Sequence, residues 1–203
     1  TIGIDLLFLF FFLVAAFSII TSRYHKLLYQ SMQSSSSLVS YEFTNRLEDL
    51  VTMTNIVRSD STVQSTLDEI YQPQEDYAVH YYSDIYSALQ KHYLEYRQPY
   101  LKMAAISCPR FITYTNENIA CRPDADLTKE LIALAEAGEG SPVWVTSHAE
   151  DHGIFLVREI KKIKNLRLDN LGTLIINVNL GDLVMEMSKI SNEYKDSYWI
   201  IYE

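Results

Sequence analysis

The spacing of hydrophobic and polar residues changes along the chain, and the first stretch is almost uniformly apolar. From Leu6 to Ile20 the sequence carries no charged residue, and Asp5 lies just before this run. Its length approaches the roughly 20 apolar residues that a membrane-spanning helix needs. Ala15 and Ala16 are followed by more apolar residues, which favours a retained anchor over a cleaved signal peptide or a buried core helix. We therefore expect a transmembrane helix over residues 1–22.

Residues 22–60 have the spacing of one long helix. They include no glycine and no proline, and side chains at alternating steps of four and three form a seam, which comprises Phe43, Leu47, Leu50, Thr54 and Val57. Such a seam fits packing on the protein's own domain and a parallel dimer stalk equally well. The serines at 34–37 would suit a flexible linker, but their apolar neighbours favour a continuous helix.

A helix break is predicted within the segment SDSTVQSTLDEI, which covers Ser59–Ile70. Ser59 or Ser61 is expected to cap the helix that follows, because a serine hydroxyl can accept a hydrogen bond from a free backbone N–H. A further helix is predicted from about Glu75 to Tyr96. Pro99 ends it, since proline disfavours helix in the residue before it.

Beyond Pro99 the spacing changes to the alternation that is typical of strands. Five strands are predicted, at Tyr100–Ser107, Phe111–Thr115, Pro142–Ser147, Ile154–Ile160 and Gly172–Leu180. Between the second and third strands lies a short amphipathic helix at Leu127–Ala137, with Asp124 or Asp126 as its cap and Gly138 as its stop.

This order of elements predicts an α+β fold, in which an N-terminal transmembrane and long helix precedes a five-stranded antiparallel sheet with helices against one side. Alternation along the last strand sends Leu174, Ile176, Val178 and Leu180 to one face, which we expect to be the core face. Asp182 is then expected to cap a closing helix.

Composition narrows the range of functions. The formal net charge is -9, with Asp+Glu 26 against Lys+Arg 17. This balance argues against a nucleic-acid surface, because phosphate binding needs clustered basic residues. The 15 tyrosines suit a folded chain with aromatic surfaces far better than a disordered one.

No catalytic or cofactor motif is evident, and we expect neither a cofactor nor a metal. His148 and His152, in the segment HAEDH, have the spacing of a metal half-site, but a third ligand is missing and the polar setting before Gly153 predicts a solvated hairpin loop. Cys108 and Cys121 flank the second strand. A disulfide that stabilises the fold by about 3 kcal/mol and two reduced, packed thiols both remain open.

The order and the local sequence of these segments resemble those of a known family. The apolar anchor, the long Ser-rich helix, the segment SDSTVQSTLDEI and the last strand in LGTLIINVNLGDLV are similar to the extracytoplasmic Cache sensor region of bacterial transmembrane receptors, most closely YesM-like sensor histidine kinases. The resemblance implies a PAS-like lobe outside the membrane and a signal passed through the long helix. It also implies catalytic kinase domains beyond Glu203, so that this segment itself would be non-catalytic.

Under this resemblance the chain has four parts: a transmembrane helix at 1–22, a helical stalk with helices packing on the lobe at 23–98, the Cache lobe at 99–192 and the start of a second, membrane-proximal lobe at 193–203. Residues after about 22 would lie outside the cytoplasm. We expect a homodimer, anchored in the cell membrane, that binds an unknown small molecule or a solute-binding protein and no nucleic acid.

Two further functions remain open at this point. One is a membrane-anchored interaction domain that docks a solute-binding protein, and the other is the sensor region of a diguanylate cyclase or a chemoreceptor. A concave, aromatic-lined pocket would favour sensing, and an exposed apolar patch would favour docking.

For a small-molecule pocket against the sheet, the sequence offers five lining residues: Tyr114, Trp144, Phe155, Arg158 and Asn177. Trp144 and Phe155 would supply stacking area, Arg158 would hold a carboxylate, and Asn177 would donate and accept hydrogen bonds. Strand alternation alone does not bring all five to one face.

Overall fold

The computed structural model of the protein describes most of the chain, namely residues 2–70, 78–116, 118, 121–149, 153–164 and 167–190. Within these ranges only the backbone is described at residues 2–9, 15, 78, 163–164, 167–168 and 190. The chain divides into two compact units, Thr1–Thr44 and Asn45–Glu203. The second lobe predicted at 193–203 lies outside the described residues.

The first unit is helical throughout its described residues. It belongs to α1 (Ile2–Ser59), which begins in the first unit and ends in the second. The helix continues through the serines at 34–37, so the predicted continuous helix is confirmed. Apolar side chains near its start are exposed, with Phe12 at 76% and Phe17 at 73%. No helix among the described residues combines the length and the apolarity that crossing a membrane requires. The side chains of Leu6–Leu9, at the start of the predicted anchor, lie outside those described.

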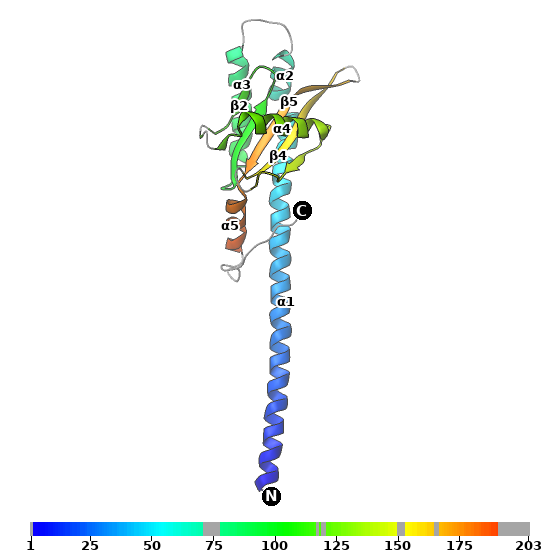
Figure 1. Ribbon diagram of the computed structural model, residues 1–203, viewed down its shortest axis with the longest axis vertical. Coiled ribbons are helices and arrows are strands. Elements are labelled where there is room, and N and C mark those ends of the chain that lie inside the picture. Colours follow the sequence, from blue (N-terminus) through cyan, green and yellow to red (C-terminus); the bar gives the residue numbers. More distant parts are fainter. Residues whose placement is uncertain are drawn as a thin grey trace. The chain divides into compact units, whose positions relative to one another are not determined.

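The second unit is an α+β fold (Figure 1). After the end of α1, its described helices are α2 (Ser61–Ile70), α3 (Ala78–Glu95), α4 (Ala125–Ala137) and α5 (Leu180–Ile190). Its strands are β1 (Leu101–Ser107), β2 (Ile112–Tyr114), β3 (Val143–Val145), β4 (Ile154–Lys164) and β5 (Arg167–Val178). The predicted fold class, a long N-terminal helix followed by a five-stranded antiparallel sheet, is confirmed.

The sheet has the strand order β2-β1-β5-β4-β3, and every neighbouring pair is antiparallel. The central strand is β5, which pairs with β1 on one side and with β4 on the other. Its apolar run suits this position, since a central strand is covered on both faces and at both edges. As predicted, the helix α4 is inserted between the second and third strands.

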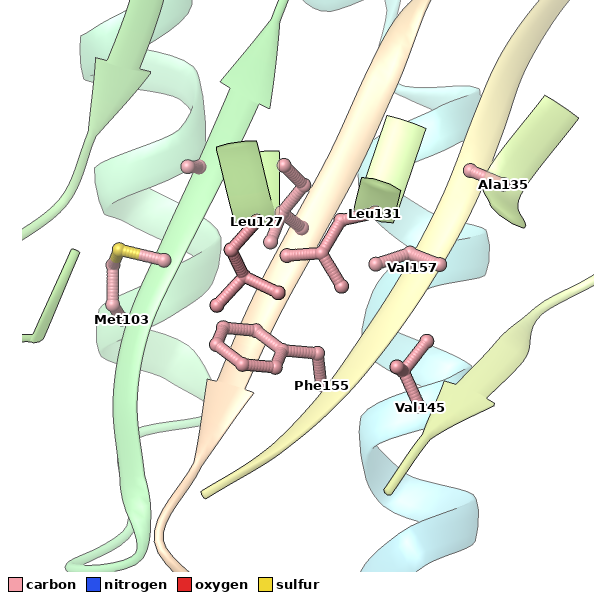
Figure 2. Close-up of a cluster of buried hydrophobic side chains, with 9 residues drawn as sticks. Met103, Leu127, Leu131, Ala135, Val145, Phe155 and Val157 are labelled. Carbon is pink, nitrogen blue, oxygen red and sulfur yellow. The ribbon is translucent and has the colours of Figure 1, made fainter. Parts of the chain in front are cut away.

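Helix α4 covers one face of the sheet with a dry apolar cluster (Figure 2). Asp124 caps this helix by accepting hydrogen bonds from two backbone N–H groups, which settles the choice between Asp124 and Asp126. Gly138 ends it. Side chains from the helix and from four strands meet in the cluster, which comprises Met103, Ala105, Leu127, Leu131, Ala135, Val145, Phe155, Val157 and Ile175. Every member is at most 6% exposed.

The opposite face of the sheet is buried as well, which corrects the expectation of helices against one side only. On β5, Leu174 and Ile176 are fully buried, and so are Thr173 and Ile175 of the alternate set, at 2% and 1% exposure. The helices α2 and α3 contact β5, β1 and β2, while α4 covers the other side. One strand therefore has two core faces, because β5 is apolar at consecutive positions rather than at alternate ones.

The last part of the α1 seam packs within the second unit. Leu50, Thr54 and Val57 are at most 1% exposed, and the Thr54 hydroxyl lies 3.0 Å from a guanidinium nitrogen of Arg158 on β4. For these three positions, packing on the protein's own domain is the observed outcome. Phe43 and Leu47 are only half-buried.

Two helix caps differ from the prediction, and both use a side chain that the pattern did not single out. Asp60 caps α2, because its Oδ1 accepts hydrogen bonds from the N–H groups of the second and third residues that follow it. Ser59 remains inside α1 instead, with its hydroxyl donating to a carbonyl of the same helix. Asn179 caps α5 by accepting from the N–H of Asp182, and Asp182 pairs with Lys102. Asp60 and Asn179 stand directly before the first residue of each helix, where a side-chain oxygen reaches the free N–H groups.

The hairpin of β4 and β5 is longer than predicted. Residues 161–164 pair with residues 167–170, and this part pairs with no other described strand. Its sequence, KKIKNLRLDN, is rich in lysine and arginine. The extension escaped prediction because this segment is mostly polar in sequence, which favoured a loop between the two predicted strands.

Candidate functional site

The five residues predicted to line a pocket are divided between the two faces of the sheet. Strand register places Tyr114, Phe155 and Asn177 on the face that α4 covers. Trp144 and Arg158 lie on the opposite face. The reason is the pleat, because Phe155 and Arg158 are an odd number of residues apart on one strand and so point to opposite sides.

On the α4 face, the predicted residues take part in packing. Phe155 is fully buried at the centre of the apolar cluster, and Asn177, its register partner, is 4% exposed. The guanidinium carbon of Arg122 lies 4.6 Å from the centre of the Tyr114 ring, a cation–π geometry. Burial raises the pKa of Tyr114 above its ordinary value, while the charge of Arg122 opposes this rise. The described cavity that could hold a ligand lies elsewhere.

Arg158 is a buried cation on β4 that binds two other segments of the second unit, the end of α1 and the turn after α4. It is 7% exposed. Its Nε donates to the carbonyl of Gly140 at 2.8 Å, and its Nη1 donates to Thr54 Oγ1 at 3.0 Å and to Asn55 Oδ1 at 2.6 Å. Burial lowers the pKa of Arg158 below its ordinary value, and the nearby charge of Arg58 adds to this effect. A ligand carboxylate, the partner predicted for Arg158, would have to displace these internal acceptors.

The turn after α4 is shaped to present a carbonyl to Arg158. Glu139 has a φ of 51° and Gly140 a φ of 89°, so two consecutive residues adopt the left-handed region, which glycine tolerates and most other residues avoid. The N–H of Ser141 donates to the carbonyl of Gly138 at 2.8 Å and closes the turn. In this conformation the carbonyl of Gly140 accepts a hydrogen bond from Arg158 Nε at 2.8 Å.

Beside Arg158 the second unit contains a cleft of about 430 Å³, within the range of about 300–1,000 Å³ that is common for small-molecule sites. Three segments that are distant in sequence form its wall: the junction of α1 and α2, the turn after α4, and β4. The lining residues are Arg58, Ser59, Gln64, Glu139, Gly140, Lys161 and Lys162. We refer to it as the basic cleft.

The charges of the basic cleft are only partly balanced. Lys162 pairs with Asp68, and Lys161 Nζ lies 2.9 Å from Glu159 Oε2, although without the geometry of a hydrogen bond. For Arg58, no side-chain hydrogen bond or ion pair occurs among the described residues. The basic cleft thus has three cationic side chains in its wall against one acidic one, Glu139. Because Lys161 and Lys162 each have a carboxylate within ion-pair distance, Arg58 is the cation of this wall that is most available to an anion.

Gln64 connects the two sides of the basic cleft. Its Nε2 donates to the carbonyl of Arg58 at 2.6 Å and lies 3.5 Å from the carbonyl of Lys161, at the limit of hydrogen bonding. One amide group therefore joins the last turn of α1 to β4. A ligand that alters this contact acts directly on the end of α1.

A residue of α3 also contacts the junction between α1 and α2. His92, which is 4% exposed, lies with its Nε2 2.9 Å from Asp60 Oδ2 and its Nδ1 3.2 Å from Glu95 Oε2. Burial alone would raise the pKa of Asp60, but the hydrogen bonds from His92 and from the N–H groups of Val63 and Thr62 outweigh it and hold the pKa below its ordinary value. The carboxylate of Asp60 is therefore stabilised in its charged form.

Several features of the basic cleft could not be recognised in the sequence. Arg58, Gln64 and Glu139 belong to different elements, and no local pattern relates them. The one available signal was the pair Lys161 and Lys162 in a chain with an excess of acidic residues, since clustered cations in an acidic protein mark a possible anion site.

The other chemical candidates do not form a site among the described residues. No group of three or more His, Cys, Asp or Glu side chains that could hold a metal ion occurs in the described part of the chain. His148 Nε2 lies 3.2 Å from a carboxylate oxygen of Glu130, while residues 150–152, with the second histidine of HAEDH, lie outside the described residues. Cys108 and Cys121 are free thiols.

Comparison with protein-family models and with curated proteins found no match for this sequence.

Proposed function

We propose that this chain is the extracytoplasmic sensing module of a bacterial transmembrane receptor, with a PAS-like lobe of the Cache type and the YesM-like sensor histidine kinases as the nearest class. In this proposal the chain catalyses nothing itself. It binds a small molecule and passes the signal along α1 to kinase domains beyond Glu203.

One observation carries the sensing role. The basic cleft is lined by Arg58 and Ser59, which form the last turn of α1. A ligand in the basic cleft would therefore contact the long helix itself, and its binding energy would act on that helix without an intermediate element. A ligand that favours one arrangement of the helix by tenfold to a hundredfold shifts the equilibrium by roughly 1.4–3 kcal/mol.

The exposed apolar side chains of the first unit support the membrane anchor. Phe10, Phe11, Phe12, Phe17 and Ile20 are each more than 60% exposed. A continuous apolar surface of this kind is unfavourable in water and marks a membrane or protein contact. The absence of charge between Leu6 and Ile20 favours the bilayer.

The proposal includes a homodimer. Because Leu50 and Val57 are buried within their own unit, contacts between two copies of α1 would use positions before them. The apolar side chains available there are Tyr24, Leu27, Leu28, Leu38 and Tyr41, each at least 45% exposed. Two helices that pair along this stretch would change their packing when the end of α1 moves.

The location is tested by labelling intact cells that make the full-length protein. Ser87, exposed on α3, is replaced by cysteine in a background in which Cys108 and Cys121 are serine. A membrane-impermeant maleimide is expected to label this cysteine before the cells are opened. The background without the Ser87→Cys change is the matched control. Labelling that occurs only after lysis would contradict an extracytoplasmic module.

The output is tested in membranes that contain the full-length protein. Incubation with radiolabelled ATP is expected to give an acid-labile phosphohistidine. Replacing the serines at 34–37 with glycines introduces flexibility into α1, since glycine disfavours helix by about 1 kcal/mol per residue relative to alanine. This variant is expected to retain external labelling but to lose its normal level of phosphorylation. Membranes that incorporate no phosphate would exclude the kinase class.

A further inference from the structure

The charges of the basic cleft lead beyond sensing in general to a class of ligand. The protein as a whole is acidic, with a net charge of -9, yet the wall of the basic cleft holds three cations, Arg58, Lys161 and Lys162, and one acidic residue, Glu139. Glu159 and Asp68, outside that wall, lie within ion-pair distance of Lys161 and Lys162, so the local excess of cations rests on Arg58 and on the buried Arg158. Long-range repulsion by the whole protein would keep anions away, so a local excess of cations is a site rather than a general surface property.

Two of these cations retain hydrogen-bond donors. No side-chain hydrogen bond from Arg58 or from Lys161 Nζ occurs among the described residues, whereas Lys162 donates to Asp68. Lys161 is within ion-pair distance of Glu159, but Glu159 Oε2 accepts no hydrogen bond from it. A guanidinium group on α1 and an ammonium group on β4 thus line the basic cleft with donors that have no hydrogen bond among the described residues.

Arg158, behind the turn that lines the basic cleft, adds positive charge. Its described hydrogen bonds all go to neutral acceptors, the carbonyl of Gly140 and the side chains of Thr54 and Asn55. Because its environment has a low dielectric constant, its charge is screened less than that of a surface arginine. It therefore strengthens the attraction of anions to the wall at Gly140.

This distribution suits a phosphoryl group better than a carboxylate. A carboxylate carries one charge and two oxygens in a plane, which a single arginine can bind with two parallel hydrogen bonds. A phosphate monoester carries about −1.5 to −2 charges at pH 7 and three acceptor oxygens. Cations that approach from α1 and from β4 match a tetrahedral group with several charges.

The volume indicates an organic molecule rather than a bare ion. The basic cleft measures about 430 Å³, many times the roughly 30 Å³ that one water occupies in the liquid. Ser59 and Gln64 add a hydroxyl and an amide to the wall, groups that hydrogen-bond to sugar or glycerol hydroxyls.

We propose that the basic cleft binds a small phosphate monoester, with the phosphoryl group between Arg58 and Lys161 and the organic part toward Ser59 and Gln64. This inference rests on the proposed sensing role of the same cleft, but binding is measured without reference to location or output.

Isothermal titration calorimetry of the purified full-length protein tests the proposal, with glucose 6-phosphate and glycerol 3-phosphate as probes. Succinate is the matched dianion without phosphorus, and glucose is the matched neutral molecule. Both phosphate esters are expected to bind, succinate at least tenfold more weakly and glucose not at all. Succinate binding as tight as that of the esters, or no binding of either ester, would overturn the proposal.

Variants assign the binding to the basic cleft. Arg58→Gln is expected to weaken ester binding by roughly tenfold or more, because a charge-assisted hydrogen bond is lost, and Arg58→Lys is expected to restore part of it. Lys91→Gln, on the exposed surface of α3, is the matched control and should leave binding unchanged. If Arg58→Gln binds the esters as tightly as the parent protein does, the basic cleft is not the binding site. Lys161→Gln is a second test of the site and is also expected to weaken ester binding. If Lys161→Gln does not fold, the result for Arg58→Gln alone decides whether the basic cleft is the binding site.

The test of ester binding and the test of the extracytoplasmic location can fail independently of each other. External labelling at position 87 together with no ester binding would leave the sensing module but remove this ligand class. Ester binding together with labelling only after lysis would retain the site and remove the extracytoplasmic role.

Discussion

Both faces of the sheet are buried, but the side chains that cover them differ in chemistry. On the α4 face the cluster around Phe155 and Leu131 is apolar throughout. The opposite face, toward α1, contains the buried cation Arg158 with its hydrogen bonds to Thr54 and Gly140. Close apolar packing leaves no room for a ligand, whereas buried polar contacts hold neighbouring elements in specific positions. The basic cleft borders the polar face.

This difference predicts where substitutions act on stability. The largest effect is expected for Phe155→Ala, which leaves a cavity in the dry cluster. The free energy of unfolding should fall by about 3–5 kcal/mol, as measured by urea denaturation of the full-length protein. The exposed Val79, at 85% exposure on α3, is the control, and Val79→Ala should change stability by at most about 0.5 kcal/mol. A loss below about 1 kcal/mol for Phe155→Ala would mean that the cluster is not closely packed.

An intermediate effect is expected for Arg158→Met, which keeps an unbranched apolar stem and removes the hydrogen-bond donors. The carbonyl of Gly140 and the hydroxyl of Thr54 lose their partner, which should cost about 1–3 kcal/mol in the same measurement. Arg110→Met, at an exposed position, is the matched control.

The opposite result for Arg158→Met is informative. Replacing buried charges with apolar residues sometimes stabilises a protein. If Arg158→Met is as stable as the parent protein or more so, the polar contacts on this face do not stabilise the fold, and the contrast between the two faces loses its energetic basis.

The helix caps Asp124, at the start of α4, and Asp60, at the start of α2, allow a second comparison. Their substitution is expected to have smaller effects on stability. Asp124, at the start of α4, accepts hydrogen bonds from the N–H groups of Asp126 and Leu127. Asp124→Ala should lower the free energy of unfolding by about 1 kcal/mol. The control is Asp126→Ala, since the side chain of Asp126 is 94% exposed and caps nothing. Equal effects of the two changes would show that α4 is held by its packing alone.

The smallest effect is a pH dependence at Asp60, the cap on the polar side. Its folded-state pKa lies below the ordinary value of 3.8, so the unfolded chain binds the proton more readily. The stabilisation is complete above that ordinary value and is lost as the pH falls below it through the folded-state pKa. Asp60→Asn keeps an acceptor for the cap but does not titrate.

Unfolding of the Asp60→Asn variant should therefore depend less on pH in this acid range than unfolding of the parent protein. Urea denaturation at a series of pH values from neutrality downward measures this. Asp126→Asn serves as the control for a change of one charge. Parallel pH profiles of the parent protein and Asp60→Asn would contradict the stabilised carboxylate.

The sequence by itself determined the local elements of this protein. Alternation placed five strands within a few residues of their observed positions, a polar break separated α1 from α2, and Asp124 was among the expected caps. These features depend on neighbours within a few residues, so a local pattern contains the information they need. The ends of β4 and β5 were missed because the segment between the two predicted strands is mostly polar in sequence.

Only the tertiary structure decided which faces are buried and which charges meet. The burial of both faces of β5 depends on helices that are remote in sequence, and the contact of Arg158 with Thr54 joins residues 104 positions apart. The basic cleft draws Arg58, Glu139 and Lys161 from three separate segments. Burial and electrostatic attraction depend on the distance between residues in space. The separation of two residues along the sequence does not give that distance.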